Sequence, residues 1–316
     1  MEKFTPIAFS ERLSKDRKTL HSYVHVLGKK LFSIDSILDK TLLYTNRIKK
    51  EGKWSAEVWL CDYDGENTKT LKGLFSYCTH PILLSSKELL FVSYELGIPK
   101  IFSYNIQTKI KKPFLSLKGS QVLPALSKDK KFLSFVSDAA GRPDLFLYSL
   151  KKREIHQLFT KAGSTQASSS FSPDGKNIAF VSDQEGSPKI YSLALPKTKR
   201  FFLPEILLLT KKNRSSSSPS WSLDGKKLIY SAKTGKIRQI WMYDFVTKSE
   251  TQITFEKKHM ENPKWTSDNR HIICNSDTEN FAEIYLINVY NKSLRKISKG
   301  VGFKKFPTLT STRVQL

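Results

Sequence analysis

Residues 170–193 read SFSPDGKNIAFVSDQEGSPKIYSL, and this stretch contains short apolar runs joined by tight turns. In the first turn Pro173 presets φ, Asp174 caps the backbone and Gly175 takes a positive φ, which together favour a β-hairpin. A second turn precedes another predicted strand, which spans residues 189–193 and contains the apolar residues Ile190, Tyr191 and Leu193. The stretch therefore predicts consecutive short β-strands.

The last of these runs contains an aliphatic residue followed by an aromatic one, and this pair recurs along the whole chain. Its six copies are Val58-Trp59, Ile101-Phe102, Leu145-Phe146, Ile190-Tyr191, Ile240-Trp241 and Ile284-Tyr285. Successive copies are 43, 44, 45, 50 and 44 residues apart, and the longest step contains an insertion near Lys197–Pro204. Repeats of about 40–50 residues built from short strands are typical of propeller blades. The sequence therefore predicts an all-β, six-bladed β-propeller with WD40-like repeats.

The first copy of the repeat lacks its opening half, because it begins directly with the apolar run at Leu42. The missing half has a counterpart at the other end of the chain, where residues 306–310 resemble residues 262–266. We therefore expect the C-terminal segment to pair with the first blade and to close the propeller, which would also cover exposed sheet edges.

Before the repeats, residues 11–33 show the periodicity of a helix. One face of this helix carries Leu20, Val24, Leu27 and Leu31. The predicted organisation is a helical segment over residues 1–41 and a propeller over residues 42–316. The chain has no run of eighteen apolar residues, and its first residues lack the apolar stretch of a secretory signal. Taken literally, this start predicts a chain that stays in the cytoplasm.

The chain carries a formal net charge of +24 with a pI of about 9.8, which allows two interpretations. A nucleic-acid binder would be basic, but such proteins usually concentrate arginine and aromatic residues on one element. Here lysine greatly outnumbers arginine and is spread through every repeat. We therefore favour a solvated basic surface with no nucleic-acid partner, and keep a basic nucleic-acid-binding propeller as an alternative. Such a surface could still meet anionic lipid headgroups as a peripheral protein.

No catalytic, cofactor or metal motif is found in the sequence. The Gly-x-Ser-x-Gly elbow, the phosphate loop, the dinucleotide fingerprint and the Cys-x-x-Cys pair are all missing. His21 and His25 have the i, i+4 spacing of metal ligands, but the glutamate of the His-Glu-x-x-His pattern and a third ligand are not evident. We therefore expect no catalytic residue, no cofactor and no metal. Of three cysteines, Cys61 and Cys78 could pair in an oxidising compartment, although the sequence does not require it.

The loops that lead from one blade into the next are the candidate interaction surface. In a propeller such loops gather around one mouth of the channel, where a partner usually docks. Asp138, Asp183 and Asp277 each follow the second strand of their repeats and could line the channel or bind a cation, but such residues more often cap turns.

Residues 57–67, which read EVWLCDYDGEN, resemble the first blade of the TolB family, the periplasmic propellers of the Tol–Pal system. The helix around His21, the Ser-Pro-Asp-Gly-Lys repeat and the closing Lys305-Phe306-Pro307 are also similar to that family. The resemblance covers about residues 13–310. It implies that the chain is shortened at its N-terminus, because only the last helix of the family's N-terminal domain is visible.

The resemblance implies a non-enzymatic, monomeric scaffold in the periplasm. Family members bind the peptidoglycan-associated lipoprotein Pal and support outer-membrane integrity and invagination at cell division. Contact with TolA and other Tol proteins is left open, because it involves the missing N-terminal segment. The remaining alternative is a propeller fragment related to prolyl-oligopeptidase-type peptidases. By position, the family's partner contacts fall on Ser120, Gln121, Gln166 and Ala167, and the comparable loops add Ser217, Glu261 and Asn262.

Overall fold

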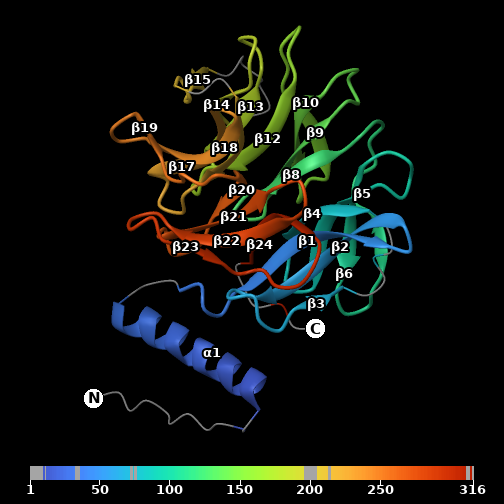
Figure 1. Cartoon of the computed structure of the whole chain (residues 1–316). Coiled ribbons are helices and arrows are strands. Elements are labelled where there is room, and N and C mark those ends of the chain that lie inside the picture. Colours follow the sequence, from blue (N-terminus) through green and yellow to red (C-terminus); the bar gives the residue numbers. More distant parts are fainter. Residues whose placement is uncertain are drawn as a thin grey trace.

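The computed structural model describes residues 10, 12–32, 36–71, 74, 77–195, 205–212, 215–310 and 314. These residues form one helix and a mostly β, propeller-like body (Figure 1). The predicted insertion near Lys197–Pro204 lies largely outside the described residues, which resume at Glu205.

Four of the sheets have four antiparallel strands each. They consist of β4 (Cys78–Leu83), β5 (Glu88–Ser93), β6 (Lys100–Asn105) and β7 (Lys111–Pro113); β8 (Val122–Leu126), β9 (Phe132–Ser137), β10 (Asp144–Ser149) and β11 (Glu154–Phe159); β12 (Gln166–Phe171), β13 (Asn177–Ser182), β14 (Lys189–Ala194) and β15 (Ile206–Leu208); and β16 (Ser216–Trp221), β17 (Lys227–Thr234), β18 (Ile237–Asp244) and β19 (Ser249–Gln252).

The fifth sheet has eight strands and joins the two ends of the chain. It consists of β1 (Thr41–Lys50), β2 (Lys53–Asp62), β3 (Lys69–Thr70), β20 (His259–Trp265), β21 (His271–Asp277), β22 (Ala282–Asn288), β23 (Leu294–Lys296) and β24 (Phe303–Leu309). Its two halves meet through one parallel pair, Ala282 with Phe303. In the described part of the chain, the sheets are therefore not closed into one continuous hydrogen-bonded ring.

The expected pairing of the two chain ends is confirmed. Strand β24 runs antiparallel to β1, with Leu42 opposite Leu309 and Leu43 opposite Thr308. The six strands β4, β8, β12, β16, β20 and β24 contact one another in cyclic order. Each is the first strand of its group of four, so the C-terminal strand takes the innermost place that the first repeat lacks.

The repeated turn holds its strands by side-chain hydrogen bonds. The hydroxyl of Ser172 donates to Oδ1 of Asp174 at 2.6 Å, and the backbone N–H of Lys176 donates to the same oxygen at 3.0 Å. Gly175 has φ +68°, as the sequence predicts. Hydrogen bonds from Ser172 and Lys176 lower the pKa of the Asp174 carboxyl. The same geometry recurs at Asp129, Asp224 and Asp268.

The recurrent aliphatic residue is buried because it sits at the centre of each sheet. All six copies are 0% exposed. In four of them the backbone N–H is capped by a side chain from further along the chain, at 2.8–3.2 Å. These pairs are Ile101 with Gln121, Ile190 with Thr210, Ile240 with Thr254 and Ile284 with Ser298. A buried N–H without a partner is costly, so the repeat conserves an acceptor as well as an apolar side chain within this chain.

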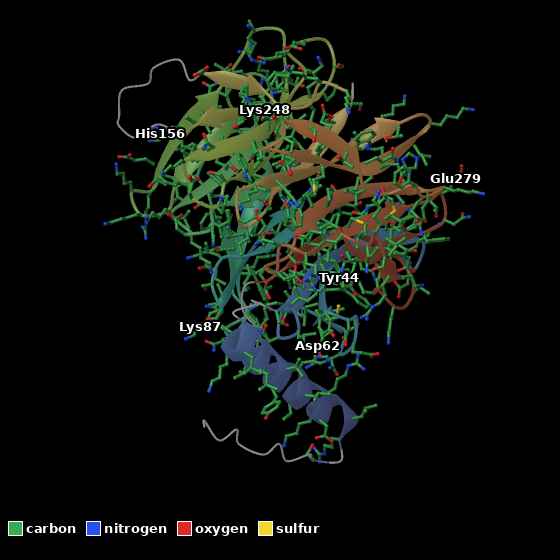
Figure 2. All side chains as sticks on the ribbon, turned by 90° about the vertical axis from the view of Figure 1, so that its left-hand side faces the viewer. Tyr44, Asp62, Lys87, His156, Lys248 and Glu279 are labelled. Atoms are coloured by element: carbon green, nitrogen blue, oxygen red, sulfur yellow. The ribbon has the colours of Figure 1, made fainter. Side chains whose placement is uncertain are left out.

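Helix α1 (Leu13–Phe32) lies outside the strands (Figure 1). It faces them with polar residues. Arg17 pairs with Asp64, and Nε2 of His21 lies 3.7 Å from the same carboxylate. The predicted apolar face is turned away, since Leu20, Val24 and Leu31 are 40–59% exposed. Figure 2 shows α1 next to the part of the body that carries Asp62. Among the described residues, no helix is long and apolar enough to cross a membrane.

Candidate functional site

The loops that enter the innermost strands are fixed by aspartates of the neighbouring strands. Asp138 accepts a hydrogen bond from the backbone N–H of Ser120 at 2.6 Å. Asp183 accepts from both the N–H and the hydroxyl of Thr165, at 2.6 and 2.8 Å. These carboxylates therefore cap turns, as the favoured interpretation of the sequence predicted. They also hold the backbone of Ser120 and Thr165 in one conformation.

Two of the predicted partner residues are buried. Gln121 is 0% exposed, and its amide accepts from the N–H of Ile101 and donates to the carbonyl of Leu117. Gln166 is 2% exposed, and its amide lies against Ser164, Pro143 and Asp144. Both amides are therefore used inside the fold, where they hold the loops in place.

The other five predicted residues are partly accessible. Ser120, Ala167, Ser217, Glu261 and Asn262 are half-buried. Ser217 and Glu261 meet through a third residue, Arg238 of β18, whereas Ser120 lies on the loop that leads into β8 and Ala167 is the second residue of β12. We call the set of Ser120, Ala167, Ser217, Arg238, Glu261 and Asn262 the entry rim.

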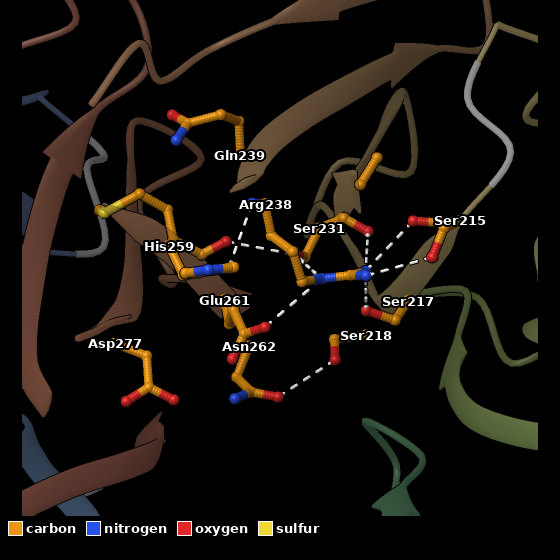
Figure 3. Close-up of polar contacts among 12 residues, drawn as sticks. Ser215, Ser217, Ser218, Ser231, Arg238, Gln239, His259, Glu261, Asn262 and Asp277 are labelled. Atoms are coloured by element: carbon orange, nitrogen blue, oxygen red, sulfur yellow. Dashed lines mark hydrogen bonds and ion pairs between the residues drawn. The ribbon is translucent and has the colours of Figure 1, made fainter. Parts of the chain in front are cut away.

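Arg238 is the centre of this polar network, as Figure 3 shows. Its guanidinium donates to the hydroxyls of Ser215 and Ser217 at 3.2 and 2.5 Å and to the hydroxyl of Ser231 at 3.1 Å. Nε lies 3.4 Å from Oε1 of Glu261. Burial lowers the pKa of Arg238, and the charge of Glu261 opposes this shift. The five N–H donors of an arginine fit such a crowded set of acceptors, which a lysine could not match.

Asn262, next to Glu261 in β20, forms a second set of hydrogen bonds. The hydroxyl of Ser218 donates to Oδ1 of Asn262 at 3.1 Å, and Nδ2 of Asn262 donates to Asn275 at 2.9 Å. Asp277, for which the sequence also favoured a turn cap, instead forms an ion pair with Lys305 of β24. Figure 3 shows Asp277 beside Asn262 and Glu261.

A cavity of about 220 Å³ adjoins this side of the body. It is lined by Thr45, Arg47, Tyr77, Thr79, His80, Tyr94, Phe303, Lys305 and Phe306. Tyr94 is 42% exposed and packs edge-on against Tyr77 at 5.5 Å between ring centroids. Sequence reasoning missed both Arg238 and Arg47. In the sequence, these two residues are distinguished only by being arginines in a chain that is rich in lysine.

His21 and His25, which have the spacing of metal ligands, lie against two different carboxylates. His21 faces Asp64, whereas Nδ1 of His25 lies 3.4 Å from Oδ1 of Asp39. No group of three His, Cys, Asp or Glu that could hold a metal ion occurs in the described parts of the chain. All three cysteines are buried and none is in a disulfide, so Cys61 and Cys78 do not form the optional bond.

Comparisons with known proteins agree with this architecture. The family model described as "TolB beta propeller domain" matches residues 29–201. The chain is 39% identical over 269 residues to a TolB homologue of Protochlamydia amoebophila, and 34% identical over 280 residues to one of Chlamydia trachomatis. These matches cover 80% and 82% of the chain but only 57% and 62% of the relatives, so the chain spans about three-fifths of their length.

A solved structure gives the same result at the level of the fold. The crystal structure of TolB from Acinetobacter baumannii matches with a TM-score of 0.77 at 20% identity, and covers 94% of this chain and 73% of that one.

Proposed function

Because the chain belongs to the TolB β-propeller family, we propose that it is a periplasmic scaffold of the Tol–Pal system that binds the lipoprotein Pal. Its place in this family makes it a non-enzymatic protein. The proposed organisation is a helical segment over residues 1–41 and six blades over residues 42–316. In this interpretation the eight-stranded sheet counts as two blades, because one residue pair alone joins its halves.

The observation that supports a docking role is the preorganised entry rim. Its loops are tied down by Asp138 and Asp183, so a partner would lose little conformational entropy on binding. Arg238 and Glu261 supply charge of both signs beside the Asn262 amide, which suits a polar partner surface. Gln121 and Gln166 contribute by holding the loops from inside.

Pal is proposed to contact Ser120, Ala167, Ser217, Glu261 and Asn262 around Arg238. Pal binding would link the propeller to the outer membrane as a peripheral, monomeric protein that supports membrane integrity and invagination at division. Neither TolA nor a nucleic acid is part of this proposal.

The test is a binding measurement with the periplasmic domain of Pal. Ser120→Trp and Ala167→Trp add bulk at two half-buried positions, one before β8 and one at the start of β12, and Arg238→Met removes the guanidinium from the network. Each change is expected to weaken the Kd for Pal at least tenfold by surface plasmon resonance, which is about 1.4 kcal/mol. The matched control is Thr108→Trp, on the exposed β6–β7 turn. Unchanged affinity in all three rim variants would reject this docking site.

A further inference from the structure

A second cavity, of about 280 Å³, lies among the innermost strands. Residues of β4, β8, β12, β16, β20 and β24 all line it. It extends from the stacked rings of His80 and Phe306, whose centroids are 3.8 Å apart, toward the turns that carry Lys128, Pro173 and Leu223. Its volume is close to the lower end of ligand pockets, which run from about 300 to 1,000 Å³. We call it the axial cavity.

The axial cavity contains one residue that breaks the pattern of its neighbours. Side chains two positions apart on a strand face the same side, so equivalent positions of the six strands form a ring. At one level this ring consists of Ile82, Ala125, Ser170, Ser220, Lys264 and Thr308. Five of these are small, apolar or hydroxyl-bearing, and the sixth is a lysine.

Lys264 has no carboxylate within the cavity. None of the described residues that line it is Asp or Glu, and no ion pair or hydrogen bond of Lys264 is found among the described residues. Burial lowers the pKa of its ammonium to about 8, so the group is still mostly charged at pH 7. His80 adds no second positive charge, because burial and then the charge of Lys264 lower its pKa to about 3 and leave its ring neutral at pH 7. Lys264 is half-buried, and an ammonium that is partly removed from water without a partner is costly, which favours an anion beside it.

Three serine hydroxyls complete the site. The oxygens of Ser168, Ser170 and Ser220 each accept a backbone N–H from the next innermost strand, at 3.0–3.1 Å. A hydroxyl that accepts one hydrogen bond keeps its own proton as a donor. No acceptor for these three protons is found within the described residues. Ser220 is 7% exposed and lines the cavity, so its donor is buried at the same level as Lys264.

We propose that the axial cavity binds a small organic carboxylate, with Lys264 as its counter-charge and the serine hydroxyls as donors. The walls formed by Ile82, Leu126, Phe171, Trp221 and Phe306 would cover the apolar body of this ligand. Of the entry rim, Asn262 alone also lines the axial cavity. The site is therefore separate from the proposed Pal surface except at that residue.

The test uses phenylacetate as the probe, titrated into the full chain by calorimetry at pH 7 and low ionic strength. We expect saturable binding at one site. The neutral analogue phenylacetamide should bind at least tenfold more weakly, because it carries no charge for Lys264. Inorganic phosphate should also bind at least tenfold more weakly, because it has no apolar body.

The matched variants are Lys264→Met, Lys264→Arg and, as a control, Lys152→Met on the exposed β10–β11 turn. Lys264→Met should weaken phenylacetate binding at least tenfold, while Lys264→Arg and Lys152→Met should stay within threefold of the unchanged chain. Equal affinity in Lys264→Met, equal binding of phenylacetamide or phosphate, or no saturable binding would each overturn the proposal.

The pH dependence of the unchanged chain provides a measurement that needs no variant. Affinity for phenylacetate should fall as the pH rises from 7 to beyond the pKa of Lys264, which is held at about 8 in the free protein. A pH-independent affinity between 7 and 10 would overturn the role of Lys264. Because the test does not involve Pal, its failure leaves the proposed docking function untouched.

Discussion

Thr41 and Thr310 hydrogen-bond to each other across 269 positions of sequence. The backbone N–H of Thr41 donates to the hydroxyl oxygen of Thr310 at 3.0 Å, and the N–H of Thr310 donates back to the carbonyl of Thr41 at 2.9 Å. Thr41 is 3% exposed, so water cannot replace these bonds. This reciprocal pair fixes the register of β1 against β24.

Thr310→Val should therefore destabilise the whole body. The change keeps the shape of the side chain but leaves the buried N–H of Thr41 without an acceptor, which costs about 1–3 kcal/mol. Urea denaturation followed by tryptophan fluorescence measures the change in the free energy of unfolding. Thr108→Val, on an exposed turn, serves as the control and should change stability by less than about 0.5 kcal/mol. Similar stability of the two variants would contradict the role of this pair.

Asp268 should contribute stability that is lost in acid. Burial alone would raise the pKa of its carboxyl, but hydrogen bonds from His271, Thr266 and two backbone N–H groups outweigh it and lower the pKa to about 2. The contribution is therefore present above the ordinary value near 4 and is lost as the pH falls from 4 to 2.

Asp268→Asn tests this stability. At pH 7 the variant should unfold about 1–3 kcal/mol more easily, and the difference should shrink between pH 4 and 2. Glu279→Gln, in the exposed β21–β22 turn, is the control (Figure 2). A difference that does not vary with pH would show that the charge of Asp268 is not what matters.

Helix α1 is expected to depend on one ion pair. Burial alone would raise the pKa of Asp64, but the hydrogen bond from Arg17 overrides it and lowers the pKa. Arg17→Met should speed hydrogen exchange of the α1 amides about threefold to tenfold, which corresponds to the modest strength of a partly exposed pair. Exchange in β21 should stay unchanged. Lys29→Met, on the same helix, is the control, and equal exchange in both variants would rule out anchoring by Arg17.

The three thiols should be unreactive in the folded protein. Burial, followed by the nearby charges of Asp62, Asp64 and Glu66, raises the pKa of Cys61 to about 12, and burial raises that of Cys274. Thiolate is the reactive form, so iodoacetamide should label no cysteine in buffer and all three in urea. Lys87→Cys adds an exposed thiol as a positive control and should react once. Rapid labelling of native Cys61, Cys78 or Cys274 would contradict the packing.

The sequence predicted those features that depend on local chemistry repeated many times. Asp174 and Gly175 define a turn by themselves, and the aliphatic–aromatic pair that recurs six times revealed the repeat. The likeness of residues 306–310 to 262–266 was enough to predict the pairing of β24 with β1, because equivalent segments occupy equivalent places.

Features that depend on distant contacts could not be predicted from the sequence. Gln121 was assigned to a partner surface because it lies in a loop, but its amide caps Ile101 twenty residues earlier. The sequence does not distinguish Lys264 from the surface lysines, because the cavity that it lines is formed by strands that are far apart in the chain. The apolar face of α1 was visible as a pattern, yet its periodicity could not show that Arg17 and His21 would face the body instead.

The innermost strands share one backbone detail with a wider consequence. His80, Leu123, Ser218, Asn262 and Phe306 all have φ between +51° and +55°, and each precedes a proline. All five residues line the axial cavity, so this part of its wall is shaped by main-chain torsion, while the side chains differ from an imidazole to an amide to a benzene ring. Substitutions at these five positions can therefore change which groups face the cavity while the backbone conformation that shapes it stays the same.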